Sequence, residues 1–189
     1  MNSNPLALKQ AMQAVALSIA GLAASANASV FGLGADRWKE ELLLHDGRKM
    51  IVERSQTYGC RSEPGQPAPI KEHKVRFTPP GSNRPVTWTS EYAADLGRTN
   101  FNLLAVHVLG VTPYIVASPN LCLAYNKWGR PNPPYVAFKY EDTEWRRIAL
   151  QALPLEFKTV NVVLSIQKTQ AQEMGAGGLT TAAEMLANE

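Results

Sequence analysis

Short runs in which apolar and polar residues alternate recur along most of the chain, separated by turn residues. In the run KMIVERSQ, for example, Met50, Val52 and Arg54 share one side of an extended chain, and Ile51 and Glu53 share the other. This period of two is typical of a β-strand with one buried face. Gly, Pro, Asn and Asp gather between the runs, where their backbone preferences favour turns. The pattern predicts a protein built mainly from β-strands.

The strand-like runs form four consecutive pairs, and we predict that each pair is an antiparallel β-hairpin. The clearest turn is Asp46-Gly47, because a two-residue hairpin turn requires positive φ at both positions and Asp-Gly tolerates it. The third pair is the most apolar, so we place it at the centre of the sheet. The predicted pairs are Trp38–His45 with Lys49–Gln56, His73–Thr78 with Pro85–Thr89, Phe101–Leu109 with Pro113–Ser118, and Tyr135–Tyr140 with Trp145–Leu150.

The segments between the pairs have weaker patterns. We expect one helical turn that ends at Gly97, a short strand over residues 121–125 and a last strand over residues 160–166. Residues 153–157 form a predicted loop whose apolar side chains fold back on the core. Hairpins with almost no helix build a β-sandwich, a barrel or a propeller-like meander, and the pattern leaves these three arrangements open.

The N-terminal segment differs in composition from the rest of the chain. Residues 1–10 carry one positive charge and no acidic residue, and residues 11–24 are almost all small or apolar. Small residues at the −3 and −1 positions then predict signal-peptide cleavage between Ala28 and Ser29. The alternative is an uncleaved anchor, although the apolar run is shorter than the roughly 20 residues of a membrane span. We therefore expect a periplasmic or secreted protein with no membrane span after cleavage.

The 189 residues fit one domain with flanking tails. After the signal peptide we expect a flexible lead-in over residues 29–37, a single β domain over 38–166 and a flexible tail over 167–189. A capping-box sequence that starts at Thr181 predicts a short helix over Ala182–Asn188 in this tail.

Charge and histidine spacing argue against several functions. The formal net charge is +3, and no Lys/Arg cluster is longer than two residues, whereas a nucleic-acid surface requires clustered basic charge. His45, His73 and His107 form no closely spaced pair, so their spacing provides no set of convergent metal ligands. No cofactor motif occurs in the sequence, and we expect no cofactor.

Cys60 and Cys122 are the two cysteines of the chain. In an oxidising compartment an even number of cysteines favours a disulfide. A bridge between these positions would close a long loop and stabilise the fold by on the order of 4 kcal/mol. Two separate buried thiols are the alternative interpretation.

The segment Tyr125–Tyr135 (YNKWGRPNPPY) is the best candidate for molecular recognition. Tyr and Trp offer large contact area at low entropic cost, Arg adds directional donors, and prolines pre-order the loop. Such a platform suits a glycan or a proline-rich peptide. The alternative is a structural loop in which the tryptophan closes the end of the β-stack. The candidate binding residues are Tyr125, Trp128, Arg130 and Tyr135.

Four motifs in the chain resemble those of a group of uncharacterised exported proteins of proteobacteria. They are WKEELLLHDGR at 38–48, ERSQ at 53–56, NFNLLA at 100–105 and YNKWGRPNPPY at 125–135. The resemblance covers roughly residues 38–165. It implies an exported β-rich protein without an assigned role, and it brings no catalytic or binding residues with it.

These observations favour an exported, non-enzymatic protein that acts in binding or in envelope structure, with an envelope protein, a peptide or a glycan as candidate partners. The alternative is a periplasmic hydrolase acting on envelope polysaccharide or peptide. The chain contains no G-x-S-x-G nucleophile motif. However, a glycosidase-type carboxylate pair is assembled by the fold, so the question of an enzyme stays open at this point.

Overall fold

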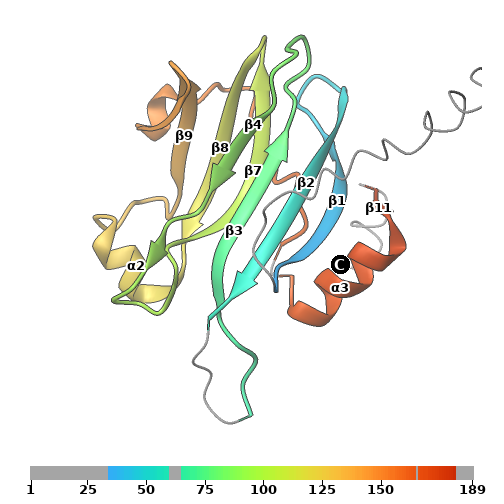
Figure 1. Ribbon diagram of the computed structural model, residues 1–189. Coiled ribbons are helices and arrows are strands. Elements are labelled where there is room, and N and C mark those ends of the chain that lie inside the picture. Colours follow the sequence, from blue (N-terminus) through green and yellow to red (C-terminus); the bar gives the residue numbers. More distant parts are fainter. Residues whose placement is uncertain (1–33, 60–64, 165, 182–189) are drawn as a thin grey trace, which may run out of the picture. The chain divides into compact units, whose positions relative to one another are not determined.

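The computed structural model describes residues 34–59, 65–164 and 166–181, which form a mainly β unit (Figure 1). Within these residues no helix is both long and apolar enough to cross a membrane. The predicted signal peptide with its cleavage site, and Cys60 of the predicted disulfide, lie outside the described residues. Cys122 is exposed and is not bonded to any described cysteine. Signal cleavage and the disulfide therefore stay predictions.

The first sheet has five strands in the order β11-β1-β2-β3-β4. Its neighbouring strands are antiparallel, except that the short β11 runs parallel to β1. The strands are β1 (Asp36–Leu43), β2 (Lys49–Tyr58), β3 (Ile70–Phe77), β4 (Val86–Thr89) and β11 (Leu179–Thr180).

The second sheet has four antiparallel strands in the order β10-β9-β8-β7. A two-stranded ribbon, β5 with β6, links β4 to β7 along the chain. The strands are β5 (Tyr92–Ala93), β6 (Arg98–Thr99), β7 (Phe101–Leu109), β8 (Thr112–Pro119), β9 (Val136–Glu141) and β10 (Glu144–Ile148). The helices are α2 (Leu121–Lys127), the 3-10 helix η1 (Leu150–Ala152) and α3 (Lys168–Gly177).

The two sheets pack against one shared hydrophobic core. Alternating apolar residues from the inner face of each sheet meet there, as in a β-sandwich. Trp88 of β4 lies with its ring centroid 5.9 Å from that of Phe138 in β9. At the edge, the indole N–H of Trp145 in β10 donates to the carbonyl of Thr87 in β4 at 2.7 Å. The described strands form no closed barrel, so the sandwich is the predicted arrangement that fits.

All four predicted hairpins are present, and the prediction of a mainly β fold is confirmed. The first turn differs in detail, because φ is positive at Gly47 (81°) but not at Asp46. The Gly47 N–H donates to the carbonyl of Leu44, and the Leu44 N–H donates to that of Arg48. This longer turn needs only one left-handed residue, which glycine adopts without a Cβ clash.

The third hairpin does not lie at the centre of a sheet, because β7 is an edge strand. The Asn161 side chain binds the backbone of one residue at this edge. Its Oδ1 accepts from the Val106 N–H at 2.9 Å, and its Nδ2 donates to the carbonyls of Val106 at 2.8 Å and Leu43 at 3.1 Å. The last strand expected over residues 160–166 is therefore absent from the described part of that segment. A side-chain amide takes the place of its backbone pairing.

The region after residue 166 is not only a loose tail. Helix α3 packs on β1, where Ala171 is fully buried. A Cβ at Gly175 would collide with the backbone carbonyl of Arg37. The predicted helix over Ala182–Asn188 lies outside the described residues. Helix α3 begins earlier, at a reciprocal capping box formed by the Gln167 and Gln170 side chains.

Two further expectations need correction. Residues 121–125 belong to helix α2 and not to a strand, because short apolar runs do not distinguish the two structures by period. In the loop at 153–157, Phe157 folds inward but Leu155 is 87% exposed. The predicted turn at Gly97 is present: its N–H donates to the carbonyl of Ala93 at 2.9 Å.

Candidate functional site

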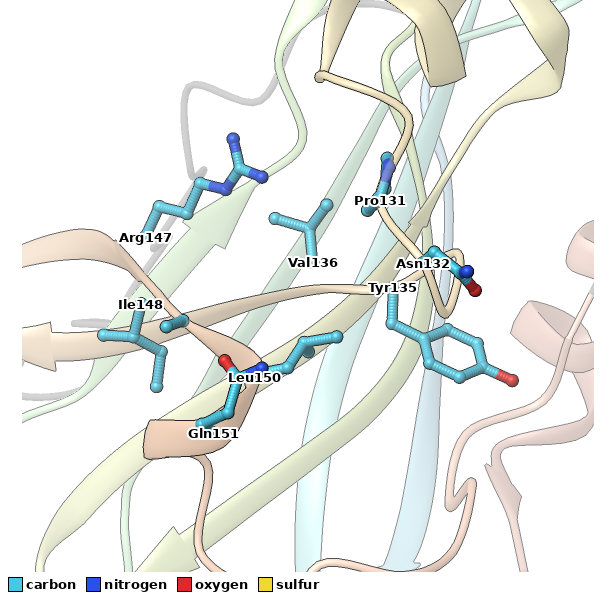
Figure 2. Close-up of a pocket in the computed structure, with 9 residues that line it drawn as sticks. Pro131, Asn132, Tyr135, Val136, Arg147, Ile148, Leu150 and Gln151 are labelled. Carbon is cyan, nitrogen blue, oxygen red and sulfur yellow. The ribbon is translucent and has the colours of Figure 1, made fainter.

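A groove of about 400 Å³ lies where the loop before β9 meets the end of β10 and η1. Its volume is within the usual range for small-ligand sites. Figure 2 shows the two sets of side chains around it, with Val136 between them. The lining residues are Pro131, Asn132, Tyr135 and Val136 from the loop and the start of β9, and residues 147–151 from the end of β10 and η1.

The end of α2 shapes the loop that forms one wall of the groove. After Lys127 the chain passes through two left-handed residues, Gly129 (φ 81°) and Arg130 (φ 52°). The Trp128 N–H donates to the carbonyl of Ala124 at 2.9 Å, and the Arg130 N–H donates to that of Tyr125 at 2.9 Å. These bonds satisfy carbonyls that the helix end leaves free. The turn then directs the proline-rich residues 131–134 toward the groove.

Trp128 is a support for the site and not part of its lining. Its ring packs against the shared core, with its centroid 4.5 Å from that of Phe101. The guanidinium carbon of Arg147 lies 5.6 Å from the centre of the same ring, within the range of a cation–π contact. This position agrees with the structural alternative for Trp128, in which it closes the end of the β-stack.

Of the four candidate binding residues, one lines this groove. Tyr125 is half-buried in α2. Arg130 is exposed, and its Nε donates to Oδ1 of Asn126 at 2.9 Å, outside the groove lining. Tyr135 is 43% exposed and lines the groove. Of the four candidates, Tyr135 therefore contributes directly to this site and Trp128 contributes through Arg147.

Arg147 is the only charged residue among those that line the groove. It is exposed, and no described carboxylate forms an ion pair with it. The strand period places its neighbour Arg146 on the opposite face of β10, where Arg146 pairs with Asp142 at 3.4 Å. The guanidinium donors of Arg147 are therefore open to a ligand.

A second polar cluster lies inside the fold, on the inner face of β1 and β2. The Arg54 guanidinium is 2.6 Å from the Glu40 carboxylate, and both side chains are buried. The Trp38 indole N–H donates to the same carboxylate. Arg54 also donates to the carbonyl of Val163 at 2.9 Å, and the Val163 N–H donates to Glu40 at 3.3 Å. The cluster ties the chain after η1 to β1 and β2, which is a structural role.

The three histidines lie in two places in the fold, with His73 buried on β3 and His45 and His107 in one aromatic cluster with Phe157. Burial and the charge of Arg54 lower the pKa of His73 from 6.5 to about 3, so this ring is neutral at physiological pH. The His107 ring stacks on Phe157 with centroids 4.5 Å apart, and burial lowers its pKa too. His45 packs edge-on against both rings. No group of three or more His, Cys, Asp or Glu side chains among the described residues is placed to hold a metal ion.

The sequence pattern did not predict the wall of the groove that residues 147–151 form. A usable signal was present in the fourth hairpin, since its register pairs Ile148 with Ala137. This pairing brings the residues after β10 next to those before β9. The proline-rich loop before β9 therefore lies beside the residues that follow β10.

A scan against protein families, a search of curated proteins and a search of solved structures each found no match.

Proposed function

We propose that the protein is an exported, non-enzymatic binding protein and that the groove beside β10 and η1 is its ligand site. The observation that carries this proposal is an open groove with one exposed arginine, Arg147, which has no carboxylate partner in the described structure and is supported from below by Trp128. A guanidinium of this kind is a recognition group, because its donors are fixed in direction.

The chemistry of the lining favours binding over hydrolysis. Hydrolysis requires a nucleophile, a base and a group that stabilises the developing oxyanion. The groove lining provides an arginine, a tyrosine, two side-chain amides and apolar residues, with no carboxylate, histidine, serine, threonine or cysteine. His73 and the Glu40–Arg54 pair are enclosed in the fold, away from this lining. The hydrolase alternative therefore has no support from this groove.

The loop beside the groove is held in place before any ligand arrives. Its start is fixed by the hydrogen bonds at the end of α2, and the Tyr135 N–H donates to the carbonyl of Pro133 at 2.7 Å. Prolines at three of the four positions 131–134 restrict the backbone further. A pre-ordered wall lowers the entropic cost of binding, which supports recognition as the role of this surface.

The groove proposal is tested by screening small organic fragments against the protein by two-dimensional NMR. We expect shift changes to concentrate at residues 131–136 and 147–151. Ala149→Trp would fill the groove from an exposed lining position and should abolish these changes. Ala152→Trp is the matched control, because Ala152 is exposed on η1 but does not line the groove. Shift changes that survive Ala149→Trp would refute the proposed site.

Export is proposed on the signal-peptide pattern, and the disulfide follows from it. N-terminal sequencing of the protein from the periplasmic fraction should give a chain that starts at Ser29. Mass spectrometry with and without reductant should show a two-proton difference from a bridge between Cys60 and Cys122. A chain that retains the first 28 residues, or free thiols in the unreduced protein, would contradict the respective proposal.

A further inference from the structure

We propose that the ligand of this groove is a small organic acid: a carboxylate bound by Arg147, attached to an apolar or ring-shaped body. This inference rests on the proposed function and adds the chemical class of the ligand. Two features carry it, which are the isolated charge of Arg147 and the mixed character of the remaining lining.

The charge of Arg147 is not neutralised within the described structure. The groove lining contains no acidic side chain, and the nearest neighbour in sequence, Arg146, is the residue that pairs with Asp142. Exposed arginines elsewhere in the described chain differ in this respect: Arg48 pairs with Asp46 at 2.6 Å, whereas Arg130 donates to the side-chain amide of Asn126 and does not line the groove. The groove therefore presents positive charge alone, and a ligand with negative charge complements it.

The planar donor set of Arg147 favours a planar anion. The guanidinium carbon of Arg147 lies over the indole ring of Trp128, 5.6 Å from its centre, and this contact helps to hold the side chain beside the groove. The five N–H donors of a guanidinium lie in one plane, in a fixed fork geometry. A carboxylate matches two of these donors at once, in a parallel pair of charge-assisted hydrogen bonds.

The rest of the lining suits a body larger than the carboxylate. Tyr135, Ile148 and Leu150 provide apolar surface, and the amides of Asn132 and Gln151 provide donors and acceptors at the rim. The volume of about 400 Å³ exceeds what a lone inorganic anion would fill. An acid with an apolar or ring-shaped body uses both the charge and this surface.

The test is an NMR titration of the protein with three probes: 4-phenylbutyrate, its neutral amide 4-phenylbutyramide, and inorganic phosphate. We expect 4-phenylbutyrate to shift the signals of residues 131–136 and 147–151 and to bind about tenfold more tightly than the amide, since one charge-assisted hydrogen-bonded pair is lost in the amide. Phosphate should bind more weakly than 4-phenylbutyrate, because it has no apolar body.

Two variants separate Arg147 from general basic charge. Arg147→Gln should reduce the affinity for 4-phenylbutyrate to that for the amide, and Arg146→Gln, which removes an equal charge from the opposite face, should leave the affinity unchanged. Equal binding of acid and amide would overturn the carboxylate inference while the groove remains a ligand site. Phosphate binding as tight as 4-phenylbutyrate would overturn the requirement for an organic body. If none of the probes, and none of the screened fragments, shifts the groove signals, the proposed function fails as well.

Discussion

In the described part of the chain, two arginines lie against tryptophan rings, one in each sheet, and their surroundings are opposite. Arg54 lies 5.0 Å from the ring of Trp38, and Arg147 lies 5.6 Å from the ring of Trp128. Arg54 is buried and donates to Glu40 and to a backbone carbonyl, whereas Arg147 is exposed and has no ion-pair partner in the described structure. The two ring contacts are therefore similar, but one arginine is buried with an ion-pair partner and the other is exposed without one among the described residues.

This difference distinguishes a structural arginine from an arginine that is available to bind a ligand. Removing a charge pair from water is costly, so a buried arginine is tolerated only when its donors and its partner are well satisfied. An exposed guanidinium keeps most of its hydration and adds little to stability. Arg54 should therefore matter for unfolding and Arg147 for binding.

The largest expected effect comes from exchanging each arginine for glutamine. Arg54→Gln leaves the Glu40 carboxylate buried without its cation, and we expect a loss of about 3–5 kcal/mol in the free energy of unfolding. Arg147→Gln should change it by less than about 0.5 kcal/mol, as for other exposed substitutions. Urea unfolding of both variants measures the difference. A loss of more than about 1.5 kcal/mol for Arg147→Gln would show that it is structural, and the comparison would fail.

The next effect is the loss of stability at low pH that the buried His73 causes. His73 has a pKa of about 3 in the folded chain, below the 6.5 of an exposed histidine, because of burial and the nearby Arg54 charge. The unfolded chain therefore binds the proton first. Stability from this group is complete above pH 6.5 and falls as the pH drops toward 3, by about 1.4 kcal/mol per pH unit.

This acid sensitivity is checked by urea unfolding at a series of pH values below 6.5. His73→Gln should reduce the slope of the unfolding free energy against pH by the contribution of one proton. Part of the slope should remain, because burial also lowers the pKa of His107. Arg147→Gln serves as the control and should leave the slope unchanged. An unchanged slope in His73→Gln would show that this histidine is protonated equally in both states.

The smallest effect distinguishes the two tryptophans. Trp38→Phe removes the indole donor from the Glu40 carboxylate, and we expect a loss of about 2–3 kcal/mol. The Trp128 indole N–H has no partner in the described structure, so Trp128→Phe should cost about 1 kcal/mol, mainly through lost packing. It should also weaken 4-phenylbutyrate binding, since Arg147 loses part of its support. Equal losses of stability in urea unfolding would place the two rings in the same structural role.

The strand pattern placed Arg54 on the same face as Met50 and Val52, but it predicted neither the burial of Arg54 nor its partner. Met50 and Val52 are both buried in the structure. Glu40 becomes its partner through the register of the first hairpin, where Trp38 lies opposite Arg54 and Glu40 opposite Val52. That register depends on the length of the turn at Leu44–Arg48, and the turn expected from Asp46-Gly47 was shorter than the one that forms.

The parts that could not be predicted are those in which single side chains replace regular structure. Asn161 binds the backbone of Val106 in β7 through its side-chain amide. Such a contact produces no alternation of apolar and polar residues in the sequence around it. The groove likewise depends on how the residues after β10 lie beside the loop before β9. Tyr135 could be proposed from its residue type and its neighbours, but Arg147 becomes a candidate only when its lack of a carboxylate partner is visible.

Asn161 also has a consequence for how the chain reaches its native state. A strand edge with unpaired N–H and carbonyl groups is a template for pairing with other chains, and therefore for aggregation. Asn161, which pairs with Val106 at the edge of β7, comes after strands β1 to β10 in the sequence. Helix α3 and strand β11, which pack beside β1, come later still. During synthesis, strands β1 to β10 are therefore complete before residue 161 and the segments after it have been added. A chain that stops before Asn161 would leave the backbone groups of Val106 and the outer edge of β1 unpaired, and we expect it to associate with other chains more readily.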